Sequence, residues 1–164
     1  MASVQIGVDI PVERFYDARG DVMAIVVRSP RKWSGPTKGL HFFTKEEDNL
    51  QVARFDHPAG YVIDPHIHNK EMREVQTCSE VLYIEKGELE VTLYDVDETQ
   101  TFTVNVGDIL ILLSGGHGFN ILSEVNVVYV KQGPYIGERD KRKIEKRDSP
   151  RSQTIPKHSS TEGP

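Results

Sequence analysis

The feature that most constrains the fold is a series of short strand-like runs, separated at close intervals by Gly, Pro and Asp turn signals. Within several of these runs apolar residues alternate with polar ones, which is the period of a half-buried strand. No run carries a convincing amphipathic helical pattern. The expected strands cover residues 21–29, 40–44, 50–57, 61–68, 80–85, 89–95, 101–106, 109–113, 117–122 and 125–131, with a short edge strand at 4–10.

This pattern predicts an all-β fold, an antiparallel sandwich or barrel, in one domain. A chain of 164 residues is long enough to bury a core of its own. Residues 138–164 are charged at first and then rich in Ser, Pro and Thr, so burial there would not offset the entropy of ordering them. We therefore expect a folded domain at 1–137 and a disordered tail at 138–164.

Charge and targeting signals bound the partners and the compartment. The net charge of −5 gives no general attraction to nucleic acid or to an anionic membrane. Residues 138–151 hold seven Lys and Arg against four Asp and Glu, which we interpret as a solvated basic stretch. No apolar run approaches the ~20 residues of a membrane span. The N-terminus lacks a signal-peptide pattern, and the single Cys78 allows no intrachain disulfide, so we expect a cytoplasmic protein.

Candidate metal ligands are the most chemically specific feature of the sequence. His66 and His68 are two residues apart in an extended run, so their imidazoles should point to the same side. Glu80 opens the next strand-like run, and His117 follows later in a glycine cluster. Three imidazole nitrogens and one carboxylate suit a divalent transition metal such as Fe, Mn, Zn or Ni better than Ca or Mg.

The order of Gly60, His66, His68, Glu80 and Gly87 resembles the first motif of the cupin superfamily, whose members are small jelly-roll β-barrels. The spacings from Gly60 to His66 and from Glu80 to Gly87 agree with that motif. Eleven residues separate His68 from Glu80, which is a longer gap than in the family.

The long gap leaves the carboxylate ligand open. Either the loop after His68 is longer than in other members, or Glu71 or Glu74 is the ligand instead. We favour Glu80, because the run from Glu80 to Gly87 resembles the strand and turn that carry the family's glutamate.

A second, less regular motif lies between residues 107 and 120. Gly107 and Gly115 match the family, and Leu113 stands where the family has Pro. His117 comes one residue early, and Asn120 is three residues beyond it rather than four. The surrounding residues 115–119 and 130–135 resemble a subgroup of small one-domain cupins found among surface-sugar biosynthesis proteins.

The resemblance implies a jelly-roll barrel with a metal held by His66, His68, Glu80 and His117. It implies isomerisation or epimerisation of a small polar molecule such as a sugar derivative, or its oxidation by O2. We expect Tyr83 and Lys131 to move protons, and Arg54 and Phe119 to contact substrate. The remaining expectation is a homodimer, since cupins commonly pair through edge strands.

Two other interpretations stay open. The first is a non-catalytic barrel that binds a sugar or another small molecule, with a structural metal or none. The second is a metal-free epimerase-like cupin in which His66 or His68 acts as a base. Within the first interpretation, the ligand set alone does not choose between isomerisation or epimerisation and oxidation by O2.

Overall fold

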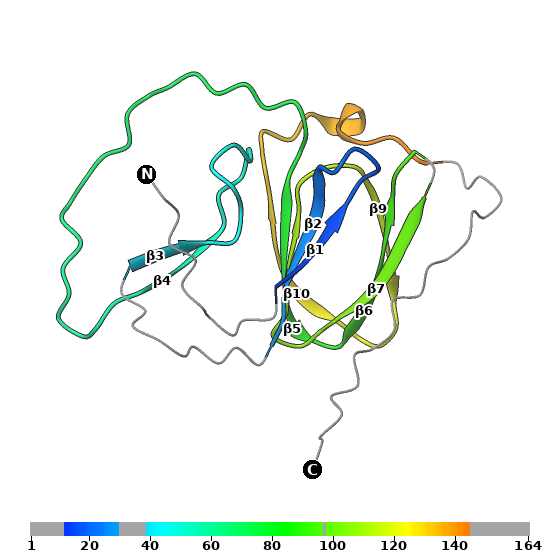
Figure 1. Ribbon diagram of the computed structural model, residues 1–164, viewed down its shortest axis with the longest axis horizontal. Coiled ribbons are helices and arrows are strands. Elements are labelled where there is room, and N and C mark those ends of the chain that lie inside the picture. The colour runs from blue at the N-terminus through cyan, green and yellow to red at the C-terminus, as the bar shows by residue number, and fades with distance from the viewer. Residues whose placement is uncertain (1–11, 30–38, 97, 145–164) are drawn as a thin grey trace, which may run out of the picture.

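The computed structural model describes residues 12–29, 39–96 and 98–144, and these residues form an all-β fold (Figure 1). They contain ten strands and one short 3-10 helix. The elements are β1 (Val12–Tyr16), β2 (Val22–Val27), β3 (Gly39–Phe42), β4 (Ala53–Asp56), β5 (Glu80–Lys86), β6 (Glu88–Tyr94), β7 (Thr99–Asn105), β8 (Ile109–Leu112), β9 (Gly116–Ile121), β10 (Asn126–Lys131) and η1 (Gly137–Asp140). No described helix is long and apolar enough to cross a membrane.

The strands form three antiparallel sheets. One has five strands in the order β1-β2-β8-β5-β10, and another has three strands in the order β7-β6-β9. The third is the isolated β3–β4 hairpin, which projects to one side of the other two sheets (Figure 1). The prediction of an antiparallel all-β fold is confirmed, although these sheets make no closed barrel within the described residues.

Alternating side chains hold the two larger sheets face to face. Leu82 and Ile84 of β5 are buried in the same cluster as Leu89, Val91 and Leu93 of β6. Residues two apart on a strand share one face, so each sheet presents an apolar inner face to the other. The core therefore lies between the two sheets, as the period-two pattern of the sequence predicts.

The β3–β4 hairpin is anchored to the opposite, outer face of the five-stranded sheet. Phe43, at the turn end of the hairpin, is buried in a cluster with Ile25, Val27 and Ile111, and Val52 packs against that cluster. Arg14 Nη2 also donates a hydrogen bond to the Phe43 carbonyl oxygen at 3.1 Å. Among the described residues, these contacts hold the turn end of the hairpin, and its far end extends away from the sandwich (Figure 1).

Residues 57–79 differ most from the sequence-based expectation. The strand expected at 61–68 is absent, and this stretch forms a long loop without regular structure. Its residues are exposed from Pro58 until Ser79, which immediately precedes β5. An extended segment becomes a strand only when a neighbouring strand supplies hydrogen bonds.

At the N-terminal end, the structure adds β1, which was not predicted. The edge strand expected at 4–10 lies outside the described residues. At the other end, the described residues include 138–144 of the expected tail, where the Asp140 carboxylate of η1 pairs with Lys131 Nζ. Ile144 lies so close to Gly116 that a Cβ there would be 2.3 Å from its Cδ1. Residues 145–164 lie outside the described part of the chain.

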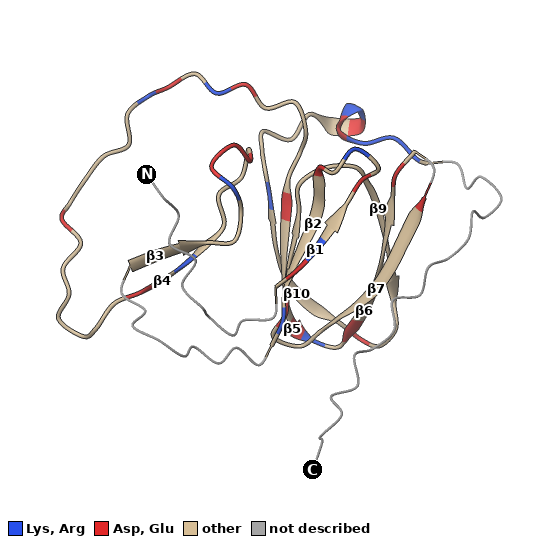
Figure 2. Ribbon diagram, viewed as in Figure 1, with Lys and Arg blue, Asp and Glu red and all other residues tan. Residues whose placement is uncertain are grey.

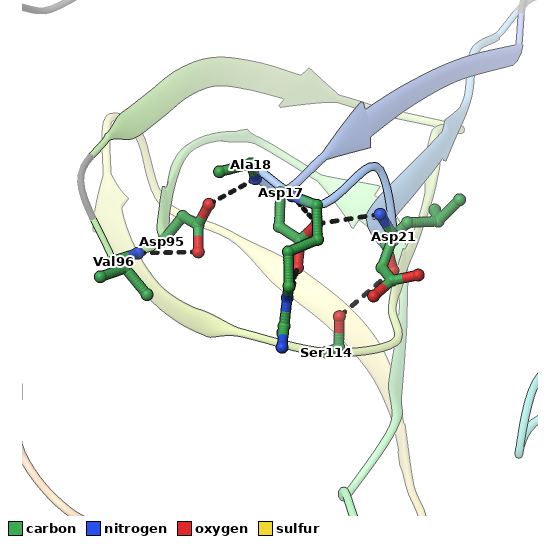
Figure 3. Close-up of polar contacts among 8 residues, drawn as sticks. Asp17, Ala18, Asp21, Asp95, Val96 and Ser114 are labelled. Carbon is green, nitrogen blue, oxygen red and sulfur yellow. Dashed lines mark hydrogen bonds and ion pairs between the residues drawn. The ribbon is translucent and has the colours of Figure 1, made fainter.

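Two aspartates tie turns together at one end of the sandwich (Figure 3). Asp17 Oδ1 accepts hydrogen bonds from the backbone N–H groups of Arg19 and Asp21, both at 2.9 Å. Asp95 Oδ2, at the end of β6, accepts one from the Ala18 N–H at 2.6 Å. The β1–β2 turn of one sheet is thereby linked to the β6–β7 turn of the other.

We expect Val91→Ala to lower the free energy of unfolding by about 2 kcal/mol, because Val91 is fully buried between the sheets. Chemical denaturation followed by circular dichroism measures this change. Val96→Ala is the matched control, since Val96 is 78% exposed, and its effect should stay within about 0.5 kcal/mol. Equal losses in the two variants would contradict this assignment of the core.

Asp17→Asn should reduce stability at neutral pH and have no effect in acid. The N–H groups of Asp21 and Arg19, together with the Arg19 side chain, lower the pKa of Asp17 below its ordinary value. A lowered pKa adds stability that is present above the unfolded-state pKa and is lost as pH falls through the folded-state pKa. Denaturation curves from pH 7 down to pH 2 should therefore converge for the two proteins, and a constant difference would refute the ionic contribution.

Candidate functional site

The candidate site is built around a contact between the two sheets. Glu80 begins β5, where it pairs with Leu112 of β8 and Lys131 of β10. His117 lies on β9 of the other sheet, opposite the buried Leu93, so its ring faces the interior. His117 Nε2 is 3.2 Å from Glu80 Oε2. A carboxylate and an imidazole thus meet across the gap between the sheets.

Tyr129 of β10 completes this cluster. It lies opposite Leu82 and two residues before Lys131, on the face of the sheet that also carries Glu80. The His117 and Tyr129 side chains hydrogen-bond to Glu80 and lower the pKa of its carboxyl, although burial acts in the opposite direction. Burial and the bond to Glu80 raise the pKa of Tyr129 well above its ordinary value. The structure therefore favours an ionised Glu80 and a protonated Tyr129 that donates to it.

Further polar groups surround the cluster on the β10 side. Lys131 Nζ pairs with Asp140, which raises the pKa of the Lys131 ammonium, and lies 5.6 Å from the centre of the Tyr135 ring. Cys78 Sγ is 3.4 Å from the Gln132 carbonyl oxygen. Burial raises the pKa of this thiol, so it is less nucleophilic than an ordinary cysteine at neutral pH.

The four expected metal ligands fall into two separate pairs. Glu80 and His117 are in contact, whereas His66 and His68 lie in the exposed loop with their ring centres 5.2 Å apart. His66 Nδ1 is 2.9 Å from the Asp64 carbonyl oxygen. Within the described residues no three His, Cys, Asp or Glu side chains lie close enough to hold one ion.

Two of the four expected ligands are therefore in contact within the described residues. The 3.2 Å separation of His117 Nε2 and Glu80 Oε2 is that of a hydrogen-bonded pair. Imidazole and carboxylate are also donor types that transition metals accept. The donor atoms fit a transition metal, but a complete site needs the histidine pair to move to the sandwich.

Glu80 is also the carboxylate that the structure places beside an imidazole. The two alternatives, Glu71 and Glu74, lie in the exposed loop, where Glu74 Oε1 is 3.4 Å from Gln76 Nε2. The structure therefore favours Glu80 over both as the partner of His117.

The remaining predicted residues are divided between the site and other places. Phe119 lies on the same face of β9 as His117, with the ring centres 5.3 Å apart. Arg54 is on the projecting β4, where it pairs with Asp56 at 2.7 Å. Tyr83 lies on the outer face of β5, opposite Val128, and faces away from Glu80.

Sequence reasoning chose the wrong tyrosine for this cluster. Tyr83 is near Glu80 in sequence, but their positions differ by three, an odd number, which puts the two side chains on opposite faces of a strand. Tyr129 is two residues from the predicted Lys131 and so shares its face. The period-two rule applied backwards from Lys131 would have found Tyr129.

Comparison of this chain with protein-family models, with curated proteins and with solved structures finds no match.

Tyr129 should ionise at a higher pH than an ordinary tyrosine, because Glu80 and burial both disfavour the phenolate. An ultraviolet titration of the wild type should show a late step that Tyr129→Phe removes. Glu80→Gln deletes the negative charge, so it should move this step to lower pH. If Glu80→Gln leaves the late step unchanged, the contact between these residues does not control Tyr129.

Proposed function

We propose that this chain is a metal-dependent enzyme of cupin type that acts on a small polar molecule, such as a sugar derivative. The observation that carries the proposal is the cluster of Glu80, His117 and Tyr129 between the two sheets. The order of cupin-like residues in the sequence and the antiparallel all-β architecture support it. In this proposal the two sheets are the halves of a jelly-roll barrel. The barrel is open between β9 and β10, the edge strands that no described strand joins.

The described groups have distinct roles in this proposal. Glu80 and His117 are two of the metal ligands, and His66 and His68 are the other two. A divalent transition metal held there would supply a Lewis acid that polarises a carbonyl or hydroxyl oxygen. Tyr129 lies within reach of Glu80, and it replaces Tyr83 as the proton-transfer residue in the proposal.

Lys131 and Phe119 line the same region. The Lys131 ammonium lies on the inner face of β10, where Asp140 holds it in place. In this proposal it contacts an anionic group of the substrate. Phe119 lies next to His117 and offers an apolar ring to the non-polar face of a sugar. A substrate with a carbonyl or hydroxyl group near a negative charge would match these neighbours.

A non-catalytic binding protein is the second candidate. It is favoured by one observation, namely that His66 and His68 do not reach Glu80 and His117 within one copy. An isomerase or epimerase exchanges a carbon-bound hydrogen of its substrate with solvent, and a binding protein does not. Nuclear magnetic resonance of ketoses and nucleotide-linked sugars incubated with the protein in D2O separates the two, and Tyr129→Phe should slow any exchange.

His66→Ala should lower bound metal to well under half of the wild-type content, because it removes one of four ligands. His117→Ala should do the same, and elemental analysis of protein purified without added metal measures both. His41→Ala is the control, since His41 lies on β3 and outside the proposed ligand set. Unchanged metal in the His66 and His117 variants, or no metal in the wild type even after reconstitution, would refute the metal site.

A further inference from the structure

One side of the sandwich is open: side chains there point inward according to the strand register, yet they are exposed to solvent. β9 and β10 are the last strands of their sheets, and no described strand pairs with their outer edges. Phe119 and Ile121 of β9 lie opposite the buried Val91 and Leu89, so their side chains point inward. They are nevertheless 41% and 55% exposed, although inner-face residues of a closed sandwich are buried.

The β10 edge shows the same feature. Tyr129 lies opposite the buried Leu82 and also faces inward, yet its residue is 51% exposed. Val128 and Val130, on the outer face of this strand, are about half exposed as well. Unpaired edge strands with apolar side chains are sites where another strand adds. We call this open side, formed by β9 and β10, the acceptor edge.

The chain also contains a segment with the properties of the missing strand. We call residues 57–76 the arm; it is exposed from Pro58 onward and forms no strand in the described structure. Ile67 is 88% exposed and Met72 is 98% exposed. Several large apolar side chains exposed along one segment are typical of an interaction surface. The exposed apolar residues of the arm are Tyr61, Val62, Ile63, Ile67, Met72 and Val75.

The arm is held at both ends to its own sandwich. The hairpin before it is anchored on the outer face of the five-stranded sheet through Phe43. After it, Thr77 Oγ1 is 3.4 Å from the Leu113 carbonyl oxygen, and the Gln132 N–H donates to the Ser79 carbonyl oxygen at 3.0 Å. Between these anchors the arm curves out on the side of the sandwich away from β9 (Figure 1).

Charges along the arm do not oppose docking. Acidic and basic residues follow one another along it, so it carries no block of one sign (Figure 2). A copy of this chain that presents both an exposed apolar arm and an open apolar edge can satisfy both by reciprocal exchange about a twofold axis.

We propose that the arm of one copy adds to the acceptor edge of a second copy, and that the exchange is mutual. The docking depends only on the open edges of β9 and β10 and on the exposed arm. Its consequence for the site rests on the proposed function: residues 61–68, once paired as a strand, would place His66 and His68 on one face beside Glu80 and His117 of the second copy. The active site would then be shared between two chains.

Crosslinking of two differently marked chains tests the exchange without using metal or activity. Both chains carry Cys78→Ser, and one also carries Ile67→Cys in the arm while the other carries Phe119→Cys at the acceptor edge. The chains are mixed, allowed to exchange under mild denaturation, refolded and treated with a short bismaleimide. We expect a covalent two-chain product from the mixture and far less from either chain alone.

Three comparisons make the result decisive. Val96→Cys, at the exposed β6–β7 turn, replaces Phe119→Cys as a matched control and should give no product with the arm cysteine. A chain carrying both Ile67→Cys and Phe119→Cys should also give two-chain products. An internally linked single chain would show that the arm folds back on its own sandwich, and a single-chain mass by light scattering would likewise overturn the proposal.

The same samples separate this inference from the proposed function. Crosslinks that persist in protein without metal would support the exchange while the metal site fails. Full metal occupancy without crosslinks between copies would support the metal site while the exchange fails.

Discussion

Burial of two apolar sheet faces against each other is the constraint on which the rest of the structure depends. The inner faces of β5 and β6 carry Leu82, Ile84, Leu89, Val91 and Leu93, and these side chains fix which residues of every neighbouring strand point inward. Because register follows from this burial, polar residues at inward positions are forced into the space between the sheets. Burial thus determines the chemistry of the interior as well as its stability.

The polar cluster is the clearest consequence of that rule. Glu80, His117 and Tyr129 all occupy inward positions at places where a hydrophobic residue would be ordinary, and they satisfy one another. Removing a polar group from water is costly unless the group is paired. A chain that keeps the buried Glu80 with the partly buried His117 and the half-exposed Tyr129 at an open edge gains no obvious stability from doing so. This is the pattern of a site, since sites are where sequences depart from the rules for stability.

The sequence was informative wherever one strand lies beside another. Strand-like runs between turn signals located β2 to β10, and with them Glu80 and His117. The prediction failed at 61–68, where the described structure supplies no neighbouring strand, and it did not find β1. The tyrosine of the cluster was also misassigned, because pairing between β5 and β10 decides which ring meets Glu80 and that pairing joins residues far apart in sequence.

In our proposal the arm of one copy lies in the open side of another copy. Hydrogen–deuterium exchange of the amides at 61–68, measured over a range of protein concentrations, distinguishes a docked arm from a free one. We expect slow exchange at high concentration, because docked amides bond to an edge strand, and fast exchange after dilution separates the copies. Fast exchange at every concentration would contradict docking, and slow exchange at every concentration down to that of the separated copies would show that the arm closes on its own chain.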